Sequence, residues 1–145
     1  MIKGGVIMKE NLIYYVLTVV VIIMTALCFT LFSNDDDYIV DFLGGYGYEV
    51  SARPIDTAQI TIPVPLNEVY EQYNKIQQKA GFDLRLYEGK KGVRYTYAIK
   101  NYPGNEEDVR ANVLVIDGEI VGGDICTLKI DGFMHELRAI ELSDA

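Results

Sequence analysis

The chain is poor in several residue types that usually carry chemistry. Its 145 residues include no tryptophan, one histidine and two cysteines, and 13 basic side chains stand against 21 acidic ones. The formal net charge of −8 argues against binding nucleic acid or another anionic polymer through bulk charge, because such binding needs a basic surface. No G-x-S-x-G motif or comparable Ser/His/Asp order occurs, so the sequence does not predict a serine hydrolase.

One long segment lacks charge altogether. Leu12 to Phe32 reads LIYYVLTVVVIIMTALCFTLF, a run of 21 uncharged residues. A helix of about 20 apolar residues is long enough to cross a bilayer. The apolar core of a signal peptide is shorter and ends at a small-x-small cleavage site, which is missing here. The sequence therefore predicts an uncleaved transmembrane signal anchor over residues 12–32.

The basic residues near this run predict its orientation. Lys3 and Lys9 precede it, and the first basic residue after it is Arg53. Because basic residues stay on the cytoplasmic side, we expect residues 1–11 to be a cytoplasmic tail and the rest to lie outside the cell membrane. A start at Met8 would leave Lys9 alone to support this orientation.

After the anchor we expect a short linker, residues 33–37, followed by one extracytoplasmic domain, residues 38–145. Residues 33–145 carry 20 acidic and 11 basic side chains, a formal charge of −9. Cys28 lies in the predicted anchor, which leaves Cys126 without a partner for an intramolecular disulfide. The core must therefore stabilise the domain.

The clearest predicted element of the domain is an amphipathic helix in LNEVYEQYNKIQQKAGF. Its apolar side chains repeat at helical spacing and form one stripe, which we expect the sheet to bury: Leu66, Val69, Tyr70, Tyr73, Ile76 and Ala80. A shorter helix is expected at Tyr38–Gly45, ending at its glycines.

The alternation of apolar and polar side chains predicts strands. We expect strands at residues 46–50 and 58–62, a half-buried strand at residues 93–102, and a β-hairpin in VRANVLVIDGEIVGGDICTL around a type I′ turn at Asp117-Gly118. Val113 to Ile116 is apolar throughout, which predicts a central strand covered on both faces, with a dimer mate as one possible second layer. The fold class is α+β, with one amphipathic helix packed on an antiparallel, cystatin-like curved sheet.

The segment richest in reactive side chains is IVGGDICTLKIDGFMH, residues 120–135. A two-residue turn at Asp131-Gly132 would place Cys126 and His135 diagonally on one face of a hairpin. A helix over residues 133–142, which the sequence also allows, would separate them.

This segment does not predict a catalytic or metal site. A cysteine nucleophile needs a base within hydrogen-bond reach, which a diagonal pair achieves only with favourable rotamers. Asp124, Cys126 and His135 offer three metal ligands, where a structural zinc site uses four in recognisable spacing. We expect no catalysis, no metal and no cofactor, and a buried thiol packed in a strand.

Two further features are candidates for a ligand surface. Gly122-Gly123 predicts a bulge or a close approach, more often by a neighbouring element than by a ligand. Tyr95 and Tyr97, together with Tyr70 and Tyr73 of the helix, could line a groove for a sugar or peptide, although tyrosines at this spacing are more often half-buried core.

The segments GYEVSARPIDTAQITIPVPLNEVYEQYNKIQQKAGFDLRLYEGK, RYTYAIKNYP, VRANVLVIDGEIVGGDIC and DGFMH resemble a known family. It comprises short, membrane-anchored Firmicutes proteins and is described only as a domain of unknown function (number forty-eight thirty). The resemblance spans roughly Tyr38 to Leu137. It implies an anchored extracytoplasmic domain and transfers no catalytic residue.

Together these features predict a single-pass membrane protein that presents an extracytoplasmic binding or regulatory module. Its partner would be an envelope protein or a second copy in a homodimer, and not a nucleic acid. The alternative is a small enzyme or ligand-binding domain with a pocket between helix and sheet near Asp124, Cys126 and His135. The candidate ligand or partner surface comprises Tyr95, Tyr97, Gly122, Gly123, Asp124, Cys126 and His135.

Overall fold

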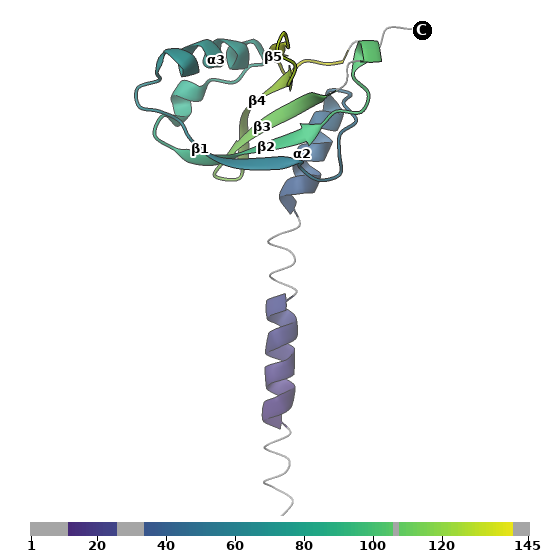
Figure 1. The fold of residues 1–145 in the computed structure, drawn as a ribbon. Helices are drawn as coiled ribbons and strands as arrows, with labels where there is room; N and C mark the ends of the chain where they lie inside the picture. The colour runs from purple at the N-terminus through teal and green to yellow at the C-terminus, as the bar shows by residue number, and fades with distance from the viewer. Residues whose placement is uncertain (1–11, 26–33, 106–107, 141–145) are drawn as a thin grey trace, which may run out of the picture. The chain divides into compact units, whose positions relative to one another are not determined.

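The computed structural model describes residues 12–25, 34–105 and 108–140 (Figure 1). The chain divides into two compact units, Met1–Asp35 and Asp36–Ala145. Residues 12–25 form a helix whose large apolar side chains are exposed. Among the described residues, no helix is both long and apolar enough to cross a membrane. Residues 26–32 of the predicted anchor lie outside the described part of the chain.

The remaining described chain has the predicted α+β fold. Its elements are α2 (Asn34–Gly45), β1 (Asp56–Thr61), α3 (Glu68–Lys79), η1 (Leu84–Tyr87), β2 (Lys91–Ala98), η2 (Pro103–Asn105), β3 (Val109–Ile116), β4 (Glu119–Thr127) and β5 (Met134–Glu136). The five strands form one antiparallel sheet in the order β1-β2-β3-β4-β5. In Figure 1, α3 lies over this sheet.

The β3–β4 hairpin has the predicted turn. Asp117 and Gly118 adopt φ angles of 54° and 80°, the two positive values that a type I′ turn requires. Pairing shifts between Leu114 and Val115, since Leu114 pairs with Gly122 and Val115 with Ile120. This irregularity lies at the glycine pair, where the sequence predicted a bulge or a close approach.

Both faces of the central strand β3 are covered by the chain itself. Val113 and Leu114 are neighbours in the strand, so their side chains point to opposite faces. Val113 packs with Ile39 and Leu43 of α2 in one core cluster, and Leu114 packs with Leu84 of η1 in the other. The predicted burial on both faces is confirmed, and it needs no dimer mate to account for it.

The predicted strand at residues 46–50 is wrong. Only Val50 contributes, through an isolated bridge to Ile99. The N–H of Tyr46 bonds to the carbonyl of Leu43, and Gly47 adopts a φ of 87°. The backbone groups that a strand would have used instead close the turn at the end of α2.

Neighbouring elements approach the two glycines of β4 closely. A Cβ added to Gly122 would lie 2.7 Å from Oε1 of Gln77 in α3, and one added to Gly123 would lie 2.6 Å from Cδ1 of Leu137. The prediction that neighbouring elements approach these glycines closely is confirmed.

Candidate ligand pocket

A pocket of about 400 Å³ opens between α3 and the sheet. Its lining comes from the helix, at Val69, Tyr70, Gln72, Tyr73 and Ile76, and from the sheet and the strand at its edge, at Ile60, Arg94, Asn112, Leu114, Asp124 and Met134. Most of these side chains are apolar or aromatic, and only a few polar groups converge among them. A cavity of this size and composition is typical of small-molecule sites.

The rotation of α3 explains why this pocket is apolar. Asn74 and Gln77 are 1% and 0% exposed, whereas Val69 of the predicted stripe is 74% exposed. Oδ1 of Asn74 accepts the N–H of Leu84 at 2.7 Å, and Oε1 of Gln77 accepts the N–H of Gly123 at 2.7 Å. These buried hydrogen bonds orient the helix. Much of the stripe therefore lines the pocket, and the prediction that the sheet buries all of it is wrong.

A hydrogen-bonded network forms the polar part of the pocket. The hydroxyl of Tyr73 donates to Oδ1 of Asp124 at 2.6 Å, and Nδ2 of Asn112 donates to Oδ2 of Asp124 at 2.9 Å. Nδ2 of Asn112 also lies 3.4 Å from Sγ of Cys126, and Oδ1 of Asn112 accepts the hydroxyl of Thr96 at 2.8 Å. Asn112 thus joins both ends of the network.

Burial sets the protonation of these groups. It raises the pKa of the Asp124 carboxyl above its usual 3.8, although the bonds from Tyr73 and Asn112 act in the opposite direction. Burial and the adjacent Asp124 raise the pKa of Tyr73 well above 10. The same two causes raise the pKa of Cys126, which favours the neutral thiol over the nucleophilic thiolate.

The raised pKa of Asp124 predicts an unusual pH dependence of stability. A group that holds its proton more tightly when folded stabilises the fold fully below its unfolded pKa, and this contribution is lost as the pH rises through the folded pKa. Relative to Asp124→Asn, which does not titrate, the wild-type chain should therefore gain stability between pH 7 and pH 4. Each unit of pKa shift corresponds to about 1.4 kcal/mol.

The ¹³C-methyl NMR signal of Met134 can measure this difference. Met134 is the only methionine in residues 36–145, so its folded and unfolded signals report the domain during urea unfolding of the full chain in lipid nanodiscs. Other carboxylates titrate in both proteins and largely cancel in the comparison. The prediction would be contradicted if the difference in unfolding free energy between the wild type and Asp124→Asn did not change between pH 7 and pH 4, or if the wild type lost stability relative to the variant on acidification.

Among the described residues, Arg94 is the only basic one that lines the pocket. Its Nη2 lies 3.5 Å from Oδ2 of Asp56, and the two side chains are 41% and 56% exposed. Its Nε is buried and, among the described residues, has no hydrogen-bond partner. Its guanidinium therefore keeps donor capacity that the fold does not use.

Only two of the three reactive candidates of residues 120–135 share a face. β4 and β5 pair Cys126 with Met134 and Ile125 with His135, so Cys126 and His135 point to opposite faces of the sheet. Asp124 and Cys126 share the pocket face, as predicted. Across the described ranges, no group of three or more His, Cys, Asp and Glu side chains could hold a metal ion.

The predicted pairing failed because the connection is longer than two residues. The N–H of Thr127 donates to the carbonyl of Phe133 at 3.1 Å, which closes the connection between the two strands. Within this connection, the N–H of Gly132 donates to the carbonyl of Lys129 at 2.9 Å. The alternative of a helix over residues 133–142 is also wrong, because Met134–Glu136 forms β5.

His135 lies in a separate aromatic cluster. Its Nε2 is 2.9 Å from the hydroxyl of Tyr102, and its Nδ1 is 2.8 Å from the carbonyl of Glu136. Phe133 stacks on both rings, with centroid distances of 5.4 Å to Tyr102 and 5.3 Å to His135, and the Tyr102 and His135 centroids are 6.2 Å apart. Tyr102 and His135 line a second pocket of about 260 Å³, together with Tyr48.

The candidate tyrosines of β2 do not join those of the helix. Tyr97 is fully buried in the core cluster of α2, and Tyr95 packs against the same cluster. Tyr70 and Tyr73 line the pocket on the opposite face. The four tyrosines therefore do not line one groove, and Tyr95 and Tyr97 belong to the core, which was the favoured alternative. β2 is covered more fully than predicted, since Thr96 on the pocket face is only 4% exposed.

The sequence reasoning missed Arg94 and Asn112 as pocket residues, and Thr96 as a hydrogen-bond partner of Asn112. A usable signal was present for Asn112, because it interrupts the apolar pattern of VRANVLVI in a strand that otherwise reads as fully buried. A polar side chain there needs buried hydrogen-bond partners. Arg94 and Thr96 share the pocket face through their positions opposite Leu114 and Asn112.

The match to a protein family covers this pocket. Residues 42–125, more than half of the chain, match the family described as Domain of unknown function (DUF4830). The chain belongs to this family. The DUF4830 match includes every residue that lines the pocket except Met134, and it excludes His135. No curated protein and no solved structure matches the chain at a significant level.

Proposed function

We propose that residues 36–145 form a binding module that takes a small, mainly apolar molecule into the pocket between α3 and the sheet. The observation that carries this proposal is the pocket itself, with apolar walls on both sides and one buried polar network. Burial raises the pKa values of Asp124, Tyr73 and Cys126, as expected for a desolvated polar network inside an apolar pocket.

We also propose that residues 12–32 anchor this module in a membrane, with the N-terminus cytoplasmic and the module outside the cell. The support is the uncharged run of 21 residues, its basic flank at Lys3 and Lys9, and the exposed apolar side chains of the helix over residues 12–25. Ligand binding would then regulate a partner at the cell envelope, either another protein or a second copy of the chain. The helix-on-sheet layout would be of the cystatin-like kind.

Closing the mouth of the pocket tests the binding function. Val69 lies at the pocket and is 74% exposed, so Val69→Trp should fill the entrance without disturbing a core. We expect this variant to bind 1-octanol at least about fivefold more weakly than wild type, because the new side chain occupies apolar volume that the ligand needs. The chemical shift of the Met134 methyl group, which lines the pocket, gives the binding curve in nanodiscs.

A matched variant controls for the added tryptophan. Leu86 is 75% exposed and lies outside the pocket, so Leu86→Trp should bind 1-octanol as the wild type does. Equal weakening in both variants, or octanol binding that leaves the Met134 signal unmoved, would count against the pocket as the ligand site.

A further inference from the structure

The two charged side chains of the pocket differ in what they can still bind. Asp124 accepts hydrogen bonds at both oxygens, from Tyr73 and from Asn112. Arg94 has one long contact to Asp56, between two exposed side chains, and such surface pairs contribute little. Its buried Nε–H has no partner in the described part of the chain. Arg94 therefore brings an unused cationic donor to the pocket.

We propose that the ligand is an amphipathic carboxylate, with an acyl chain against the apolar wall of α3 and its carboxylate on Arg94. This inference rests on the proposed binding function. A guanidinium binds a carboxylate through two parallel N–H···O bonds, and Arg94 lines the pocket with an Nε–H that has no partner among the described residues. The wall opposite is formed by side chains such as Val69, Ile76 and Leu114, which suits a flexible hydrocarbon chain.

A cationic head group fits the pocket less well. It would have to reach the Asp124 carboxylate, which is 1% exposed and already accepts the Tyr73 and Asn112 donors. It would also have to lie beside the guanidinium of Arg94, where like charges repel. A carboxylate on Arg94 would share the guanidinium with Asp56, whose Oδ2 lies 3.5 Å from Nη2, and it would satisfy the orphaned Nε–H.

The experiment compares octanoate with 1-octanol on the full-length chain in lipid nanodiscs, at a fixed ratio of lipid to protein and at pH 7. The Met134 methyl shift measures occupancy, and empty nanodiscs give the partitioning of each probe. Octanoate should bind more tightly than 1-octanol. Arg94→Gln should weaken octanoate about tenfold or more and leave octanol within about twofold, because bonds to a charged donor are the strong ones.

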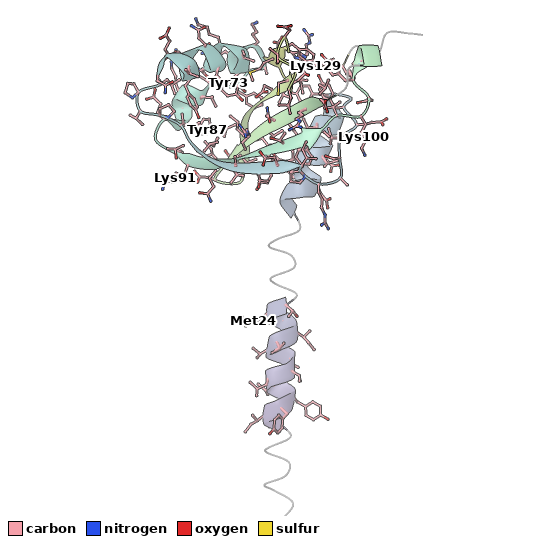
Figure 2. All side chains as sticks on the ribbon, viewed as in Figure 1. Met24, Tyr73, Tyr87, Lys91, Lys100 and Lys129 are labelled. Atoms are coloured by element: carbon pink, nitrogen blue, oxygen red, sulfur yellow. The ribbon has the colours of Figure 1, made fainter. Side chains whose placement is uncertain are left out.

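Two further variants test whether the loss of octanoate binding in Arg94→Gln depends on the guanidinium group itself. Lys91→Gln removes a positive charge from the exposed start of the same strand, labelled in Figure 2, and should leave octanoate binding unchanged. Arg94→Lys keeps the charge without the two-pronged geometry and should bind octanoate with intermediate affinity.

The possible failures are distinguishable. Equal affinity for octanol and octanoate, or equal losses in Arg94→Gln and Lys91→Gln, would overturn the carboxylate while leaving the apolar pocket in place. No binding of either probe would overturn the proposed function as well. A third probe is an acetylated Ala-Leu-Leu peptide with a free carboxylate. If it bound more tightly than octanoate, the ligand would be the carboxyl end of a peptide and not an acyl chain.

Discussion

Replacing Asn112 with leucine is expected to lower the free energy of unfolding by about 3–5 kcal/mol. The substitution removes the donor to Oδ2 of Asp124 and the acceptor of the Thr96 hydroxyl. Both Asp124 and Thr96 are buried, at 1% and 4% exposure, so water cannot replace the lost partner. Each buried group left unsatisfied costs about 1–3 kcal/mol, and more when it carries a charge. Urea unfolding followed by the Met134 methyl signal measures the loss.

A second substitution separates the lost hydrogen bonds from simple repacking. In Asn112→Leu/Thr96→Val the orphaned hydroxyl is gone, so the double variant should be more stable than the sum of the two single losses predicts. Strict additivity would mean that Thr96 and Asn112 do not act together. A loss below about 1 kcal/mol for Asn112→Leu would mean that the network contributes little to the fold.

Local patterns were enough to predict most strands and the hairpin. Asp117-Gly118 prescribes its own turn through two positive φ angles, whatever surrounds it. The apolar pattern of residues 113–116 reports burial on both faces, because each neighbour in a strand faces the opposite way. Such signals lie within a few residues of one another, which is why a single sequence reveals them.

The geometry of the pocket depends on contacts that are distant in the sequence. The rotation of α3 is set by Gln77, which bonds to Gly123 in β4, and by Asn74, which bonds to Leu84 beyond the helix. Helical periodicity ranks these residues as surface, because it counts apolar side chains and cannot anticipate buried polar ones. The register of β5 escaped prediction for a related reason, since the length of its connection and not the local pattern decides which residues pair.

Gly123→Ala is expected to destabilise the fold by about 2–4 kcal/mol, although it adds a single methyl group. The added Cβ would lie 2.6 Å from the backbone carbonyl of Asn112 and 2.6 Å from Cδ1 of Leu137. A backbone oxygen in the middle of a paired strand cannot move aside without disturbing the ladder. Overpacking of this kind typically costs 1–3 kcal/mol, and somewhat more where the backbone must shift.

The same chemical change at Gly44 provides the control for Gly123→Ala. Nothing lies within 4 Å of the Cβ that Gly44→Ala would add to α2, and alanine favours a helix over glycine by about 0.5–1 kcal/mol. That variant should be as stable as wild type or slightly more so in the same Met134 urea titration. Because the N–H of Gly123 bonds to Oε1 of Gln77 in α3, Gly123→Ala should also shift the Met134 signal of the folded state, as β4 moves against α3. A stable Gly123→Ala with an unchanged signal would mean that the packing at Gly123 can relax and does not fix the wall of the pocket.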